Sequence, residues 1–205
     1  MTGWYQKHIL PRLLNAAMSR TEFEKIRPQV LADAVGVVLE IGVGAGHNLP
    51  LYKNVSKLYA LEPFLELVAL AKTRAQPLSF PVEFLIAGAE CIPLADKSVD
   101  TVVSTWTLCS VGDPQKVLSE IKRVLRPEGT FVFVDHGASP NTFVRAAQTL
   151  GTSVTEYVTG NCHYNRPIEK LLTEAGFTIT KMSHPSERFK PLIYNYQGIA
   201  MAEKS

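Results

Sequence analysis

The 205-residue sequence is poor in cysteine, in uncompensated charge and in long apolar runs, and each shortage excludes a class of protein. Its 3 cysteines, Cys91, Cys109 and Cys162, are odd in number and include no CxxC pair. This argues against a disulfide framework and fits a reducing compartment. With 21 Lys and Arg against 19 Asp and Glu, the formal net charge is only +2, so no broad basic field is available for nucleic acid.

No segment is apolar enough to predict a membrane span. The longest apolar runs, such as Ala34–Leu39, fall far short of the ~18 residues that a spanning helix needs. Lys7, His8, Pro11 and Arg12 interrupt the N-terminal segment, which therefore lacks the apolar region of a secretory signal. We expect a cytoplasmic protein, and a surface-lying N-terminal helix stays open as a route to peripheral membrane contact.

Length and composition predict one globular domain over residues 1–205. Hydrophobic residues make up 46% and charged residues 20% of the chain, which excludes a disordered chain, a collagen-like repeat and a long coiled coil. A chain of this size buries about 70% of its surface on folding, enough for one core. The composition leaves the oligomeric state open.

Short β-branched runs alternate with helical patterns along the chain, which is typical of βαβ units and a parallel sheet. The runs predict strands over 35–41, 57–61, 82–86, 99–106 and 130–135. Helices are predicted from about His47, over 64–75, and from Pro114 after the N-cap residue Asp113. Two further strands, 178–182 and 193–201, follow each other without a helix between them. The predicted fold is therefore α/β, a seven-stranded, mostly parallel sheet with an antiparallel C-terminal strand and helices on both faces.

A glycine-rich loop follows the first predicted strand, in the segment Glu40-Ile-Gly-Val-Gly-Ala-Gly46. Open α/β sheets bind ligands at this carboxyl end, and glycines let the backbone approach them closely. The GxGxxG dinucleotide motif requires a glycine where this chain has His47, and Glu40 would repel a pyrophosphate. Both features disfavour a nicotinamide dehydrogenase and favour a cationic sulfonium or α-amino group. A turn that binds nothing is the alternative.

Two further segments are placed to complete a nucleoside site. Glu62 ends the second predicted strand about 20 residues after the first glycine, where these folds place a carboxylate on the ribose hydroxyls. Pro63 offers a flat apolar surface to an adenine ring, and residues 87–90 after the third strand can close over its other side. A surface glutamate without a ligand is the simpler interpretation of Glu62 when it is taken alone.

These segments together resemble the class I S-adenosylmethionine-dependent methyltransferases, the Rossmann-like type, in their type-11-like branch. The resemblance covers about 35–202 and rests on EIGVGAG (40–46), Glu62, AGAECIPLADKSVDTVVS (87–104) and EIKRVLRPEGTFVFVDHG (120–137). A narrower similarity, to thiol S-methyltransferases and bacterial phospholipid or quinone methyltransferases, rests on TLCSVGD (107–113), TGNCHYNRP (159–167) and LIYNYQGIA (192–200).

The resemblance implies S-adenosylmethionine as cofactor, S-adenosylhomocysteine as product, and a three-part division of the domain. Residues 1–33 would form a helical cap, 34–137 the cofactor-binding half, and 138–205 the substrate-side helices and C-terminal hairpin. Relatives often carry an aspartate where this chain has Gly88, so another group must contact the adenine amino group here. The implied cofactor-binding residues are Glu40, Gly42, Gly44, Gly46, Asn48, Glu62, Pro63, Gly88, Ala89, Glu90 and Thr105.

Asp135 and His136 end the fifth predicted strand at the same crevice and are the candidate catalytic residues. Successive strand residues face opposite sides, so only one of them can face the substrate. His136 is the better base by its intrinsic pKa, and a purely structural histidine is the alternative. The candidate substrate contacts are Trp4, Tyr5, Trp106, Cys109 and His163.

No metal is predicted. The possible ligands Cys109, His136, Cys162 and His163 include no pair at the usual zinc spacing.

We expect methyl transfer to a small, lipophilic acceptor: a thiol, an amine, a phospholipid headgroup or a quinol. Many relatives carry a histidine pair where this chain has Cys109-Ser110, and a thiol, with a pKa near 8.5, needs little help from a base. Methylation of nucleic acid is disfavoured by the balanced charge and by the absence of an Asn/Asp-Pro-Pro-Tyr run. The alternative function is a non-catalytic S-adenosylmethionine-binding sensor or partner subunit.

Overall fold

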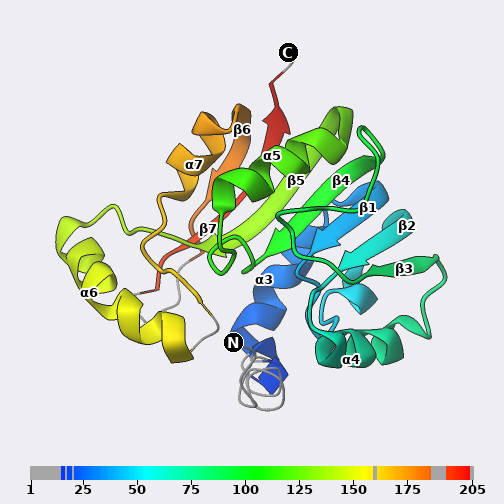
Figure 1. The fold of residues 1–205 in the computed structure, drawn as a ribbon, viewed down its shortest axis with the longest axis horizontal. Coiled ribbons are helices and arrows are strands. Elements are labelled where there is room, and N and C mark those ends of the chain that lie inside the picture. Colours follow the sequence, from blue (N-terminus) through cyan, green and yellow to red (C-terminus); the bar gives the residue numbers. More distant parts are fainter. Residues whose placement is uncertain (1–14, 17, 20, 159–160, 186–192, 204–205) are drawn as a thin grey trace.

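The computed structural model describes residues 15–16, 18–19, 21–158, 161–185 and 193–203. One seven-stranded sheet runs through them in the order β3-β2-β1-β4-β5-β7-β6 (Figure 1). Neighbours from β3 to β5 are parallel, and β7 is antiparallel to both β5 and β6, as predicted. The strands are β1 Val35–Ile41, β2 Asn54–Leu61, β3 Val82–Leu85, β4 Val99–Thr105, β5 Leu125–His136, β6 Phe177–Ser183 and β7 Asn195–Ala202.

Helices cover both faces of the sheet (Figure 1). The period-2 alternation along β5 sends Phe131 and Phe133 to the core under α5 and α7, and Val132 and Val134 to the core under α3, α4 and the 3-10 turn η1. No helix among the described residues has the length and apolarity to cross a bilayer. The helical elements are α3 Thr21–Leu31, η1 Leu49–Leu51, α4 Leu65–Ala75, α5 Pro114–Val124, α6 Thr142–Val158 and α7 Ile168–Glu174.

Local signals account for some element boundaries and fail at others. The α5 helix begins at Pro114 as predicted, because the side chain of Asp113 accepts a hydrogen bond from Lys116 N at 3.0 Å. The helix predicted from about His47 is wrong: only the three-residue turn η1 forms, since β2 begins at Asn54 and leaves no room. Strand β5 begins at Leu125, earlier than predicted, through its pairing with Val99.

The strand order places a topological switch point between β1 and β4. From β1 the chain continues to β2 and β3 on one side, whereas β4 leads to β5 on the other. Because these five strands are parallel, their carboxyl ends share one edge of the sheet, and open α/β sheets bind ligands in the crevice at such a point. The glycine loop, Glu62, Trp106 and His136 all follow or end these strands.

Candidate functional site

The glycine loop at the end of β1 is built from three glycines in the left-handed region, with φ of 65° at Gly42, 55° at Gly44 and 82° at Gly46. A Cβ at Gly42 would collide with Thr107, and one at Gly46 would lie 2.9 Å from the Ala71 backbone. A Cβ at Gly44 would meet only the Gly42 carbonyl oxygen, at 3.9 Å. Gly44 therefore borders open space that a side chain would fill, which fits a cradle for a bound cofactor.

Glu62 joins the glycine loop to the start of α4. Its carboxylate accepts hydrogen bonds from Gly44 N at 3.0 Å and Phe64 N at 3.1 Å, and the residue is only 4% exposed. Burial raises the pKa of this carboxyl, against the effect of the two N–H donors. Glu62 thus lies beside the predicted cofactor cradle, and each oxygen keeps acceptor capacity for a ribose hydroxyl.

Exposed apolar side chains flank Glu62, as a site for an adenine ring requires. Phe64 is 42% and Leu65 63% exposed next to the exposed Pro63. Ile86, which is 50% exposed, follows β3 beside them, because Leu61 of β2 pairs with Leu85 of β3. This apolar surface at the carboxyl edge is the feature that a bound adenine would cover.

Glu90 fills the space beside Gly88, where relatives often carry an aspartate. Its Oε2 lies 3.0 Å from the position of a Cβ on Gly88, and its Oε1 accepts a hydrogen bond from Gly112 N at 3.0 Å. A carboxylate is therefore present at this place in the site although the chain supplies it from two residues later. Ala89, in contrast, is buried and packs in the core under α5.

Glu40 lies in a buried hydrogen-bond network behind the glycine loop. Its carboxylate accepts from Asn48 Nδ2 at 2.7 Å and from the Tyr52 hydroxyl at 2.9 Å. Asn48 also donates to Thr105 Oγ1 at 2.9 Å and accepts from Arg27 Nη1 at 2.6 Å. Asn48, a predicted cofactor-binding residue, thus contacts Glu40 directly, and Thr105, another, contacts Asn48. Burial raises the pKa of Glu40 to about 7.

This pKa predicts how cofactor affinity depends on pH. A cationic ligand favours the ionised carboxylate, so its binding lowers the pKa of Glu40. Affinity for S-adenosylmethionine is therefore expected to be constant above about pH 7 and to fall below it, by at most about tenfold per pH unit. Calorimetric titrations from about pH 5.5 to 8 measure this, with Glu40→Gln as the control that should show a flat profile. A flat profile in the unaltered protein would contradict the interaction of Glu40 with the positively charged cofactor.

Trp106, a predicted substrate residue, forms a wall behind the site. Its ring packs edge-on against Phe23 at 4.5 Å between centroids, and the Arg27 guanidinium lies 5.2 Å from its centroid. Its indole N–H donates to Asn195 Oδ1 at 3.2 Å, and the residue is only 7% exposed. A tryptophan with φ of 52° is a backbone outlier directly after β4, and such strain is concentrated at functional sites.

Asp135, a predicted catalytic residue, is fully buried and bonded to backbone. One carboxylate oxygen accepts from Leu108 N at 2.7 Å, and the other accepts from Cys109 N at 2.9 Å and His136 N at 3.1 Å. Burial raises the pKa of this carboxyl. The contacts indicate that Asp135 anchors the loop after β4 to the end of β5.

Cys109, Cys162 and His136 lie against one another beside that loop. The two Sγ atoms are 3.3 Å apart, and His136 Nδ1 lies 3.3 Å from Cys162 Sγ and 3.7 Å from Cys109 Sγ. All three residues are buried. Burial raises the pKa of the Cys109 thiol, whereas contacts with Cys109 and then His136 lower the pKa of the Cys162 thiol.

The structure separates the remaining predicted substrate residues. His163 is only half-buried, and its backbone N–H donates to the Cys109 carbonyl at 2.9 Å. Cys162, its neighbour, which the sequence offered only as a possible metal ligand, lies in the thiol–imidazole cluster instead. Trp4 and Tyr5 lie outside the described residues.

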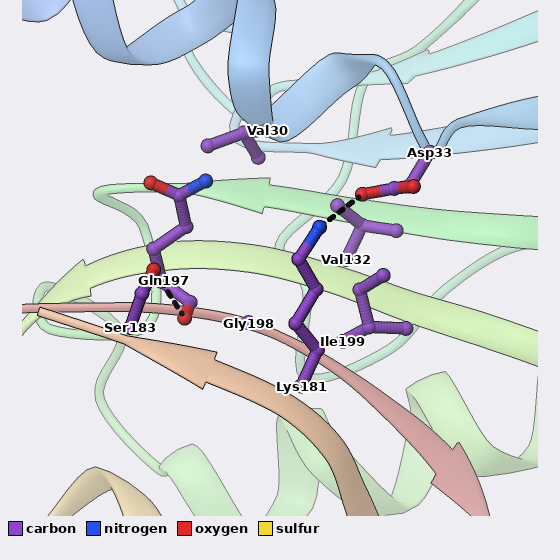
Figure 2. Close-up of a pocket in the computed structure, with 8 residues that line it drawn as sticks. All are labelled: Val30, Asp33, Val132, Lys181, Ser183, Gln197, Gly198 and Ile199. Carbon is purple, nitrogen blue, oxygen red and sulfur yellow. Dashed lines mark hydrogen bonds and ion pairs between the residues drawn. The ribbon is translucent and has the colours of Figure 1, made fainter.

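A pocket between α3 and the strands β5, β6 and β7 is separate from these groups (Figure 2). Lys181 reaches across it toward Asp33, with 3.4 Å between Nζ and Oδ2, and both side chains are substantially exposed. None of its lining residues comes from the glycine loop or from the segment between β4 and α5. We therefore place the functional site at the carboxyl edge.

Comparison with known proteins gives three findings. A family model described as a methyltransferase domain matches residues 39–133. The human thiol S-methyltransferase TMT1B is 30% identical over 188 residues, 89% of this chain and 77% of that protein. A phosphatidylethanolamine N-methyltransferase of Cereibacter sphaeroides is 35% identical over 105 residues, 50% of this chain and 52% of that protein.

A solved structure supports the fold. The YcgJ protein of Bacillus subtilis superposes with a TM-score of 0.71 at 16% identity, over 90% of this chain and 99% of that one. At this identity the similarity concerns the fold alone.

Proposed function

Since this chain belongs to the class I S-adenosylmethionine-dependent methyltransferase family, we propose that it methylates the sulfur of a small, lipophilic thiol. The observation that carries the choice of a thiol is the extent of the similarity to a thiol S-methyltransferase, which includes 89% of this chain. The similarity to the phosphatidylethanolamine N-methyltransferase extends over only 50% of this chain.

The contacts of Asp135 agree with an acceptor that needs no strong base. An amine or hydroxyl is protonated at neutral pH and must lose a proton during transfer, whereas a thiol is already a few per cent thiolate. Asp135 has no exposed surface and accepts three backbone N–H groups, so it is poorly placed to take that proton. His136 is buried, and its Nδ1 lies against two sulfurs.

The remaining residues are assigned to binding and orientation. When bound, S-adenosylmethionine supplies an electrophilic methyl group on a positively charged sulfur. The open side of Gly44 and the apolar surface around Glu62 fit this cofactor, and we assign the ribose hydroxyls to the Glu62 carboxylate. Glu40 contributes negative charge behind the loop, and Trp106 with Phe23 closes the site from the side of α3. Holding two reactants in place and excluding water supplies most of the acceleration that such a displacement needs.

A matched panel of acceptors tests the choice of thiol. Single-turnover transfer from methyl-labelled S-adenosylmethionine is measured for an alkyl thiol, amine, alcohol and quinol with the same apolar group, and for vesicles containing phosphatidylethanolamine. The thiol is expected to react at least ~100-fold faster than the others, the lower end of what a positioned base supplies. Its rate should rise with pH until the bound thiol is fully ionised.

A faster amine or headgroup would replace the thiol with a nitrogen acceptor. Binding of the cofactor without transfer to any acceptor would instead favour the sensor or partner-subunit alternative.

A further inference from the structure

Two thiols and an imidazole converge on one point at the carboxyl edge of the sheet. Tetrahedral zinc binds sulfur at about 2.3 Å and imidazole nitrogen at about 2.0–2.1 Å, which places two sulfurs about 3.8 Å apart and sulfur about 3.6 Å from nitrogen. The observed separations are 3.3 Å between Cys109 and Cys162 Sγ, and 3.3 and 3.7 Å from these sulfurs to His136 Nδ1. Each distance lies within about half an ångström of one face of a zinc tetrahedron.

The arrangement is fixed by contacts that do not involve the three side chains. Asp135 accepts the N–H groups of Leu108 and Cys109, which sets the position of the first thiol relative to β5. Further hydrogen bonds join this loop to the segment that carries Cys162: His163 N to Cys109 O, Asn161 Nδ2 to Ser110 O, and the Arg166 guanidinium to Leu108 O and Val111 O. Ligands held by their supporting contacts form a preorganised site.

The donor set selects among metals. Two thiolates with a neutral imidazole balance the charge of a divalent ion, so the metal-loaded site is neutral before an incoming thiol binds. Mixed sulfur and nitrogen ligands in tetrahedral geometry are typical of zinc. Structural zinc sites have four protein ligands, whereas sites with three keep a position for substrate or water.

We propose that Cys109, Cys162 and His136 bind one Zn²⁺ ion and leave its fourth position to a thiol sulfur. The metal site stands on the geometry alone, whereas the identity of the fourth ligand rests on the proposed function. The cluster lies beside the cofactor cradle: Thr107, two residues before Cys109, bonds to Ile41 O at 3.2 Å and blocks a Cβ at Gly42. On filling, both protein thiols and the incoming thiol release their protons to solvent.

Cobalt titration of the full chain tests the metal site. Protein stripped of metal under reducing conditions is titrated with Co²⁺, which reports tetrahedral thiolate ligation by intense visible bands and near-ultraviolet sulfur-to-cobalt charge transfer. One equivalent should bind and be displaced by one equivalent of Zn²⁺. Cys109→Ser, Cys162→Ser and His136→Gln should each weaken binding at least ~100-fold, whereas Cys91→Ser, which removes the exposed third cysteine, should leave it unchanged.

Several outcomes would overturn the metal site. They are the absence of the charge-transfer band, binding that persists in all three ligand variants, and a Cys109–Cys162 disulfide in protein isolated without air. If circular dichroism shows that the ligand variants do not fold, the metal site is judged from two proteins instead. These are the unaltered chain and Cys91→Ser, through the stoichiometry and spectrum of cobalt binding.

The fourth position is tested separately. A small alkyl thiol, and not the matching alcohol, should strengthen the charge-transfer band of the cobalt-loaded protein. An unchanged spectrum would rule out a thiol as the fourth ligand but would not contradict the metal site. Full thiol methylation by metal-free protein would overturn a role for the ion in the reaction and leave the proposed function standing. Metal binding without methylation of any thiol would overturn the proposed function and leave only the metal site.

Discussion

Gly44→Val is expected to lower affinity for S-adenosylmethionine by at least ~100-fold while the sheet stays folded. In the free protein a Cβ at this position meets only the Gly42 carbonyl oxygen at 3.9 Å, so the substitution has room. The two added methyl groups would then occupy the space that faces the bound cofactor. The φ of 55° also strains a β-branched residue, by roughly 1–2 kcal/mol, which lowers stability without unfolding the domain. Calorimetric titration with S-adenosylmethionine measures the affinity.

Gly176→Val separates the loss of cofactor space from the backbone strain. Gly176 has a φ of 76°, and the nearest atom to an added Cβ is the mobile Nζ of Lys122 at 2.7 Å. It follows α7, away from the glycine loop, so the same strain should cost stability but leave cofactor affinity within a few fold. Unaltered affinity in Gly44→Val would mean that the loop is a turn without a ligand.

The sequence predicts those parts of the fold that rest on local signals. The apolar run 35–41 and the Asp113-Pro114 pair mark β1 and the start of α5, because strand burial and helix capping act over a few residues. The start of β5 could not be predicted in this way. Leu125 directly follows a helix, and only its pairing with Val99 of β4 makes it part of a strand.

In the candidate site, too, the residues with local sequence signals were predicted, and those that only the fold brings together were not. The glycine loop and Glu62 carry spacing that is visible in the sequence, and the structure places Gly44 and Glu62 in direct contact. The partners of Glu40 are less visible, because Arg27 reaches the network from α3 and Tyr52 follows η1. Cys162 could not be paired with Cys109 from spacing, since 53 residues separate them and only the fold brings the sulfurs to 3.3 Å.

Asp135 shows that the position of a residue can be predicted from the sequence while its contacts cannot. The sequence places a carboxylate at the end of the fifth strand beside the crevice, and this is where the structure has it. Its three N–H donors lie in the backbone of the adjacent loop and of its own strand, which no residue pattern reveals. The contacts assign it to positioning Cys109 and His136 rather than to proton transfer.

Asp135→Asn is therefore expected to destabilise the protein strongly. The amide keeps one acceptor oxygen but turns an NH₂ group toward buried N–H donors, leaving one or two of them unsatisfied at about 1–3 kcal/mol each. A loss of about 3 kcal/mol would lower the Tm by roughly 6–12 °C in a domain of this size. Calorimetric unfolding measures the shift, and cofactor affinity should stay within a few fold because Glu62 and Gly44 keep their contacts.

Asp113→Asn is the matched control, and kinetics give the decisive comparison. Asp113 also accepts a backbone N–H, from Lys116, but it is exposed at the start of α5, where asparagine caps about as well as aspartate. The Tm of the Asp113→Asn variant should hardly change. A proton acceptor would show the opposite pattern in Asp135→Asn: an unchanged Tm, a kcat lowered by about 10²–10⁴, and loss of the acid limb of the rate profile. A positioning residue gives a lower Tm and a thiol rate that still rises with pH, because the proton that must leave belongs to the acceptor and not to Asp135.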